Sequence, residues 1–123
     1  MLLAIDIGNT NIVTGLFDDE KLIKSNRFIT KTNSSTSYYL QNLSHFKKSC
    51  LAGRQAKINA VIIASVVPLI NKNIRNSIAK LFNLEPFFIN ADSFKGLLAI
   101  KVKNKNEVGA DRLVNAYAAK KLY

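Results

Sequence analysis

The sequence predicts an α/β domain in which three antiparallel strands come first and helices then alternate with strands. Three observations favour this fold class. Short apolar runs separated by turn residues fill the first thirty positions. Residues 58–65 form an apolar run whose centre, residues 60–64, shows no polar alternation, which is typical of a strand buried on both faces. Apolar residues at helical spacing precede and follow that run.

The first three strands are expected at residues 1–7, 11–17 and 21–30. The first two are apolar and flank a turn too short for any other connection, so we expect them to pair as a hairpin. The cluster Asp18-Asp19-Glu20 is a turn signal that separates the second strand from the third. The apolar residues of the third strand are Leu22, Ile23, Phe28 and Ile29. Three successive strands with short turns make an antiparallel meander.

A helix is expected next, capped by Ser34, Ser35 or Thr36 and ending near Gly53. The strand at residues 58–65 follows, and its lack of polar alternation implies helices packed on either side of it. Pro68 then opens an amphipathic second helix. The apolar faces are Tyr39, Leu43, Phe46 and Cys50 in the first helix, and Ile70, Ile74, Ile78, Leu81 and Phe82 in the second.

The remaining elements are a short strand at residues 86–90, a strand or extended loop at 97–102, and a last helix from Glu107 or Val108 toward Tyr123. The order β-β-β-α-β-α-β-α is that of a ribonuclease-H-like domain, the building block of the sugar-kinase, heat-shock-protein and actin superfamily. We therefore expect residues 1–123 to be one ATPase-like domain, the first of two, ending in the helix that leads toward the second.

Asp6 is the only charged side chain among the first seventeen residues, and it stands where an apolar strand meets a turn. An unpaired carboxylate is costly to bury in such a run, and a bound divalent cation is a common partner at a strand end. Gly8 lets the backbone approach a ligand, while the segment Asn9-Thr10-Asn11 adds donors suited to phosphate oxygens bridged to Mg²⁺. The pattern predicts a phosphate-binding hairpin. The alternative is an ordinary β-turn in which neighbouring amides satisfy Asp6.

A second group of polar residues, Gly109-Ala110-Asp111-Arg112, precedes the last predicted helix. A carboxylate can accept the proton of an attacking hydroxyl, and a guanidinium can bind a substrate carboxylate through two hydrogen bonds. A helix start adds unpaired backbone N–H groups beside an anion. The alternative is an ordinary helical first turn with a stabilising acid and a surface arginine.

Three motifs together resemble the N-terminal half of type III pantothenate kinases. They are Asp6-Ile7-Gly8-Asn9-Thr10, Ser65-Val66-Val67-Pro68 and Val108-Gly109-Ala110-Asp111-Arg112, in the family's order and at about its spacing. The resemblance implies ATP-dependent phosphorylation of pantothenate, the first step of coenzyme A synthesis. One departure is Val102-Lys103-Asn104-Lys105, where the family commonly has Tyr-Asp-Asn-Pro.

The resemblance also implies site residues. Asp111 would be the general base and Asp6 the metal ligand. The pantothenate site would be Gly109, Ala110, Asp111 and Arg112, and the ATP phosphate site Asp6, Ile7, Gly8, Asn9, Thr10, Asn11, Ile12 and Val13. The implied cofactors are ATP, Mg²⁺ and a monovalent cation, K⁺ or NH₄⁺, whose site this sequence does not identify. The complete enzyme would be a homodimer.

The 123-residue length suits one small domain, whereas this superfamily places its active site between two. No Asp-Gly-Thr phosphate motif follows Asp111. We therefore expect a truncated or split gene product or an expressed fragment, a poor kinase alone, with a separate C-terminal half as a candidate partner.

The composition limits which other classes of protein the chain could belong to. The single cysteine, Cys50, excludes an internal disulfide framework and is expected to fill the core, while His45 is expected at the helix surface. Without a signal peptide or long apolar run, a cytoplasmic protein with no membrane partner is expected.

The net charge of +10 keeps a kinase-derived transcription accessory or nucleic-acid-binding protein as the alternative, with lysines 101, 103, 105, 120 and 121 as its basic patch. Because the lysines are dispersed and no recognition motif is present, nucleic-acid binding is the less favoured hypothesis.

Overall fold

The N-terminal apolar runs form a meander, as predicted. In the computed structural model, which describes residues 1–53 and 57–90, β1 (Leu2–Ile7) pairs antiparallel with β2 (Asn11–Asp18), and β2 pairs antiparallel with β3 (Lys21–Ile29). The hairpin register sets Ile7 opposite Ile12 and Leu2 opposite Phe17. The tight β2–β3 turn places Asp19 in the left-handed region with φ 52°, which Asp tolerates better than most residues.

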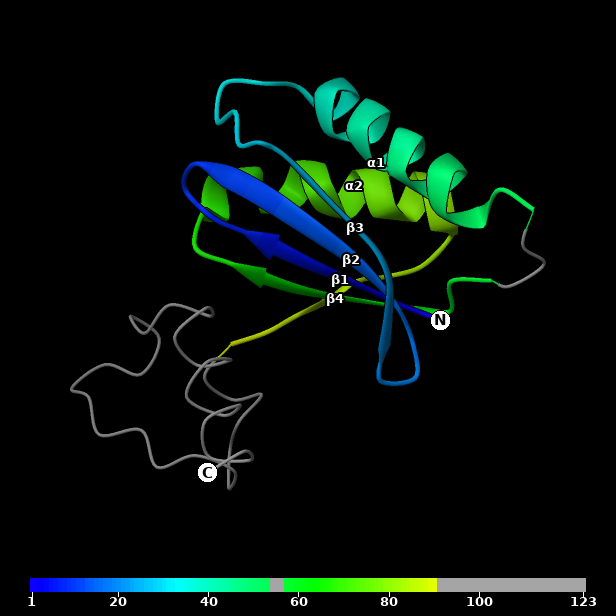
Figure 1. Cartoon of the computed structure of the whole chain (residues 1–123). Coiled ribbons are helices and arrows are strands. Elements are labelled where there is room, and N and C mark those ends of the chain that lie inside the picture. The colour runs from blue at the N-terminus through cyan, green and yellow to red at the C-terminus, as the bar shows by residue number, and fades with distance from the viewer. Residues whose placement is uncertain (54–56, 91–123) are drawn as a thin grey trace, which may run out of the picture.

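Two parallel strands extend the sheet on the other side of β1. The first, β4 (Ala60–Ser65), pairs with β1, and the short β5 (Phe87–Phe88) pairs with β4. The strand order is β3-β2-β1-β4-β5, so β1 lies at the centre (Figure 1). The predicted element order is confirmed as far as β5, while the last predicted helix lies outside the described residues.

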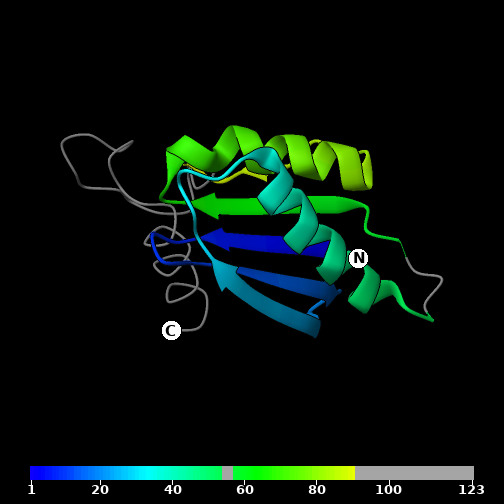
Figure 2. The same cartoon turned by 90° about the horizontal axis from the view of Figure 1, so that it is seen from above.

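The helices are α1 (Thr36–Leu51) and α2 (Asn71–Phe82), the latter preceded by the 3₁₀ turn η1 (Pro68–Ile70). Both helices lie on the same face of the sheet (Figures 1 and 2). Within the described residues, no helix combines the length and hydropathy needed to cross a bilayer.

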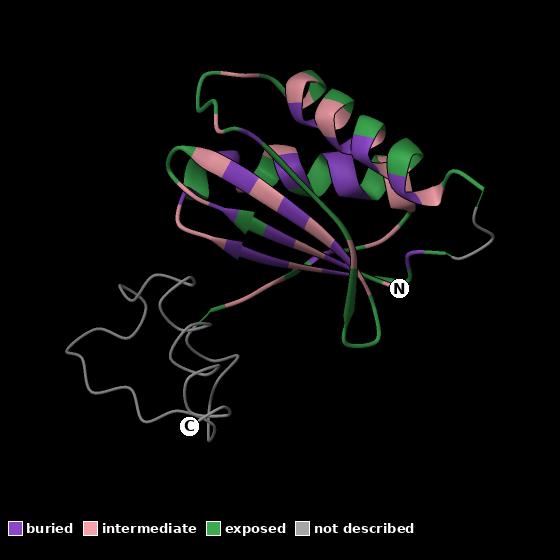
Figure 3. Cartoon of the chain, in the orientation of Figure 1, coloured by how far each residue is buried: buried purple, intermediate pink, exposed green. Residues whose placement is uncertain are grey.

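The core lies between the sheet and these helices (Figure 3). Side chains alternate between faces along a strand, so every second residue of β1 and β2 is buried against the helices. Cys50 belongs to this core and His45 is exposed, as predicted. The main core side chains are Leu3, Ile5, Ile7, Ile12, Leu16, Tyr39, Leu43, Phe46, Cys50, Val61, Ile63, Ile70, Ile74 and Ile78.

The structure differs from the sequence prediction in two places. Pro68 opens a 3₁₀ turn, and α2 itself begins only at Asn71. Ser35 is the N-cap residue of α1 but forms no side-chain capping bond. Both described helices lie on one face of the sheet, and Ile62, on the other face, is half-buried. We call this second face the open face of the sheet. The last predicted helix lies outside the described residues, so the expectation of helices on either side of β4 stays a prediction.

Candidate phosphate-binding site

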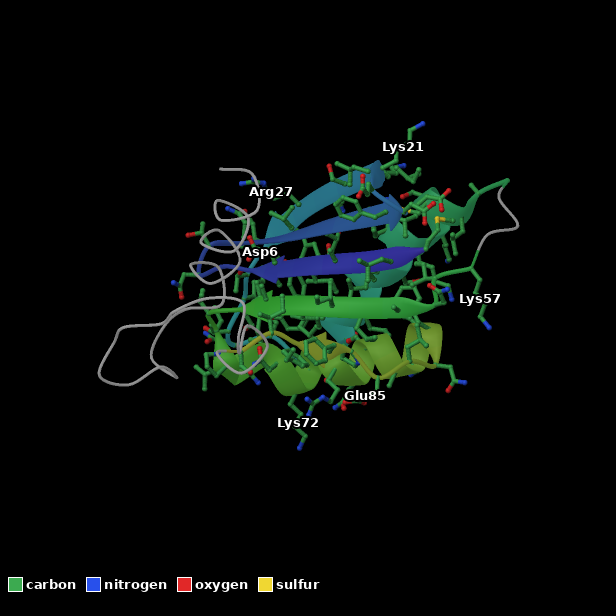
Figure 4. The ribbon with its side chains drawn as sticks, turned by 90° about the horizontal axis from the view of Figure 1, so that it is seen from below. Asp6, Lys21, Arg27, Lys57, Lys72 and Glu85 are labelled. Carbon is green, nitrogen blue, oxygen red and sulfur yellow. The ribbon has the colours of Figure 1, made fainter. Side chains whose placement is uncertain are left out.

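Asp6 lies near the end of the central strand with its side chain on the open face. Its neighbours in the chain, Ile5 and Ile7, are buried on the helix side, so the alternation of the strand directs Asp6 the other way. The register places Val13 of β2 and Ala64 of β4 on either side of it. Asp6 is exposed, and Figure 4, viewed from the open face, shows it at the hairpin end of the sheet. A charged ligand could therefore approach the carboxylate from this face.

The turn beside Asp6 is tight. The Gly8 N–H donates to the Asn11 carbonyl at 2.9 Å, and Asn9 and Thr10 are exposed at the tip. A Cβ atom on Gly8 would lie 3.1 Å from the Asn11 carbonyl oxygen, closer than most such contacts. Glycine thus permits the close approach of two backbone segments that closes the turn.

Thr30, which directly follows β3, bonds to this turn through two groups. Its hydroxyl donates to the Gly8 carbonyl at 2.7 Å, and its backbone N–H donates to the Thr10 carbonyl at 2.9 Å. Sequence reasoning placed Thr30 at the end of a strand and gave it no part in the site. The hydrogen bond from the Thr30 hydroxyl joins residues that are 22 positions apart in the sequence, so only the tertiary structure reveals it.

The second motif lies next to the first. The parallel register pairs Ser65 with Ile7, and the Val66 N–H donates to the Ile7 carbonyl at 3.0 Å. The Ser65 hydroxyl donates to Asn71 Oδ1 at 2.6 Å and accepts the Val67 N–H at 3.2 Å, which fixes the chain between β4 and η1. Two of the three motifs therefore meet at one end of the central strands β1 and β4.

Arg27 contributes a cation to the same end of the open face. It is opposite Val13 in the β2–β3 register, and Val13 is opposite Asp6 in the β1–β2 register. The three residues therefore form a row across the sheet, and Figure 4 shows the Arg27 and Asp6 side chains at the same end. Arg27 is exposed and forms no ion pair with any described residue. A guanidinium at this position suits an anionic ligand.

The open face is hollowed along the same strands. A depression of about 450 Å³ is lined mainly by apolar or small side chains, and among its described lining residues only Asp6 is ionisable. It is lined by Ala4, Ile5, Asp6, Val13, Thr14, Gly15, Phe17, Leu22, Ser25, Ile62, Ala64 and Ile89. The strand alternation places the buried Ile5 and Thr14 side chains on the helix side, so these two residues face the depression through their backbone. Because only Asp6 is ionisable, it is the described lining residue that can place a negative charge in this depression.

The donor set fits Mg²⁺ held together with a nucleotide better than a preformed metal cage. Across residues 1–53 and 57–90, no three His, Cys, Asp or Glu side chains form a group that could hold a metal ion. Mg²⁺ characteristically keeps several waters and takes only one or two carboxylates together with substrate phosphates. One exposed carboxylate beside a glycine turn satisfies that requirement.

The predicted substrate residues Gly109, Ala110, Asp111 and Arg112 lie outside the described part of the chain. The lysines of the alternative basic patch, at positions 101, 103, 105, 120 and 121, lie outside it as well. The described part of the chain therefore contains the first two motifs and not the third.

Comparison with solved structures supports the fold. The chain is similar to a Bacteroides thetaiotaomicron protein with an actin-like ATPase fold, with a TM-score of 0.53 at 12% identity over 72% of this chain and 32% of that one. It is also similar to the ROK hexokinase of Thermus thermophilus, with a TM-score of 0.51 at 17% identity over 73% of this chain and 35% of that one. At these identities the likeness confirms the ribonuclease-H-like, actin-type fold and nothing further.

Comparison at the sequence level identifies the family. The family model for type III pantothenate kinase matches residues 2–123. A type III pantothenate kinase of Agathobacter rectalis is 38% identical over 123 residues, which are 100% of this chain and 46% of that protein. The chain thus spans about half the length of this relative. On these grounds, the chain belongs to the type III pantothenate kinase family.

Proposed function

We propose that this chain supplies the phosphate-binding part of an ATP-dependent pantothenate kinase. The enzyme would transfer the terminal phosphoryl group of ATP to the primary hydroxyl of pantothenate, giving 4′-phosphopantothenate for coenzyme A synthesis. The observation that carries the proposal is the exposed Asp6 carboxylate on the open face, beside a turn closed by Gly8. Membership of the family supports the choice of substrate.

The proposed nucleotide site is the hairpin and its flanks. Asp6 would hold Mg²⁺ through its coordinated waters, and residues 7–13 would surround the phosphates with backbone and side-chain donors. Mg²⁺, when bound, would neutralise charge on the phosphate oxygens. Arg27 is close enough along the sheet to add a long-range positive charge to that side.

The proposed pantothenate site is the third motif. Asp111 would accept the proton of the attacking hydroxyl, and Arg112 would bind the pantothenate carboxylate through paired hydrogen bonds. Gly109 and Ala110 would bring backbone N–H groups to the same place. The support is the chemistry of these residue types together with the family match that covers them.

The remaining parts of the proposal concern the complete enzyme. A second domain would supply the other phosphate loop, either in continuation of this chain or as a separate polypeptide. The enzyme would use K⁺ or NH₄⁺ in addition to Mg²⁺, would be a homodimer, and would work in the cytoplasm without a membrane or nucleic-acid partner. The second domain, the cations and the homodimer follow the family resemblance, and the remaining expectations follow the composition of the sequence.

Asp6→Ala is expected to weaken Mg·ATP binding by this chain by roughly tenfold or more, about 1.4 kcal/mol, because the carboxylate that would hold the metal is removed. Binding by the unaltered chain should itself be weak, since its 123 residues contain no second phosphate motif of the Asp-Gly-Thr type. Isothermal titration calorimetry at high protein concentration measures both affinities.

The matched control for this experiment is Asp18→Ala. Asp18 is also exposed, but it lies at the end of β2 that is away from the β1–β2 turn. Its removal therefore changes the net charge equally without touching the proposed site. Equal affinities of the Asp6→Ala and unaltered chains for Mg·ATP would refute the role of Asp6.

A further inference from the structure

Thr30 is bonded to the carbonyl groups on both sides of Asn9. The hydroxyl bonds the Gly8 carbonyl at 2.7 Å and the backbone N–H bonds the Thr10 carbonyl at 2.9 Å. Because both bonds come from one residue, the position of Thr30 sets the orientation of two successive parts of the turn.

The Thr30 hydroxyl reaches the turn from the helix side of the sheet. Phe28, two residues earlier, is buried on that side, and residues two apart in an extended chain point the same way. Asp6 points to the open face, between Ile5 and Ile7, which are buried on the helix side. The hydroxyl and the carboxylate therefore lie on opposite sides of the hairpin.

This arrangement determines where the Asn9 N–H points. In a planar trans peptide unit, the carbonyl of one residue and the N–H of the next point in opposite directions. The Gly8 carbonyl is directed toward Thr30, so the Asn9 N–H is directed away from it, toward the side that carries the Asp6 carboxylate. A backbone donor beside the proposed metal ligand is suited to a phosphate oxygen.

Two tyrosines of α1 hold Thr30 in place. The Tyr38 hydroxyl donates to the Ile29 carbonyl at 2.6 Å, and the Tyr39 hydroxyl donates to the Lys31 carbonyl, so the carbonyls before and after Thr30 are both fixed. Burial raises the pKa of Tyr39 above its ordinary value of 10.0, which keeps this hydroxyl protonated as a donor. The two rings pack edge to face with centroids 5.1 Å apart.

We infer that Thr30 is a positioning residue of the nucleotide site: its hydroxyl orients the Gly8–Asn9 peptide so that the Asn9 N–H faces the phosphates. The inference rests on the proposed phosphate binding by the hairpin. Thr30 itself touches no phosphate and acts through the turn. The tyrosines extend this support from the hairpin to α1.

Three variants separate positioning from simple stability. Thr30→Val has nearly the same shape and lacks the hydroxyl, whereas Thr30→Ser keeps it. Thr14→Val is the matched control, because Thr14 is also a β-branched residue with a hydroxyl bonded to a backbone carbonyl, that of Asn26 at 3.4 Å, but it lies away from the turn and is fully buried. Thermal melting of each variant shows how far stability alone changes.

The first readout needs no ligand. In an isotope-labelled chain, the carbonyl ¹³C shift of Gly8 and the ¹⁵N relaxation of Gly8, Asn9 and Thr10 report the hydrogen bond and the rigidity of the turn. Thr30→Val should shift the Gly8 carbonyl signal and make the turn more mobile, while Thr30→Ser and Thr14→Val should leave both unchanged. An unchanged turn in Thr30→Val overturns the inference. If that variant does not fold, Thr30→Ala removes the same hydroxyl and is judged by the same criteria.

The second readout is titration with Mg·ATP followed at the Asn9 amide. Thr30→Val should bind roughly tenfold more weakly than the unaltered chain, and the other two variants within about twofold of it. Unaltered affinity in Thr30→Val, despite a changed turn, overturns the inference. If the unaltered chain binds no Mg·ATP, the proposed function fails and the phosphate part of the inference with it, while the first readout still decides whether Thr30 orients the turn.

Discussion

Asp111→Asn is expected to lower the turnover of a complete kinase by roughly 10²- to 10⁴-fold, the range for loss of a general base. Asparagine is nearly the same size as aspartate but cannot accept the proton of the attacking hydroxyl. The enzyme for this test would join the chain to the part of the Agathobacter rectalis relative that lies outside the matched 46%. Turnover is measured as pantothenate-dependent release of ADP.

Two companion variants make the result specific. Arg112→Ala should mainly raise the KM for pantothenate, because it removes binding of the substrate carboxylate rather than proton transfer. Asp19→Asn, in the exposed β2–β3 turn, should leave turnover unchanged. Full turnover in Asp111→Asn would place the base elsewhere.

Phe46→Ala is expected to lower the free energy of unfolding by about 3–5 kcal/mol, the cost of deleting a buried aromatic side chain. Phe46 is 1% exposed and belongs to the core cluster between α1 and the sheet. Since small domains are stable by only about 5–15 kcal/mol, this change alone removes a large part of the total. Urea unfolding followed by circular dichroism measures it.

The neighbouring residue supplies the control. His45 is exposed on the same helix, and His45→Ala should change the free energy of unfolding by no more than about 0.5 kcal/mol. Similar losses in the two variants would mean that α1 does not pack on the sheet as described.

Local patterns were sufficient to predict the meander and the faces of both helices. A turn of residues 8–10 between two apolar runs leaves few alternatives to a hairpin, and the apolar spacing of α2 correctly placed Ile74 and Ile78 in the core. At β4, the apolar run predicts helices on both faces. The described helices cover one face, and the last predicted helix lies outside the described residues, so this part of the fold stays a prediction.

Some residues of the candidate site can be identified from the sequence, and others only from the structure. Asp6 could be identified from the sequence because a lone charge in an apolar strand is conspicuous. The contribution of Thr30 could not, because it depends on how the end of β3 aligns with the β1–β2 turn. The meeting of Ser65 with Ile7 likewise requires a long-range parallel pairing that no local pattern encodes.

The most direct test of the proposed nucleotide site uses Mn²⁺ in place of Mg²⁺, added with ATP to the ¹⁵N-labelled chain. The paramagnetic ion broadens nearby amide signals, so the broadening locates the metal. We predict the strongest broadening at Gly8, Asn9 and Thr10, with loss of this effect in Asp6→Ala. Broadening centred instead on the acidic turn Asp18-Asp19-Glu20, at the other end of β2, would contradict a metal–nucleotide site at the hairpin.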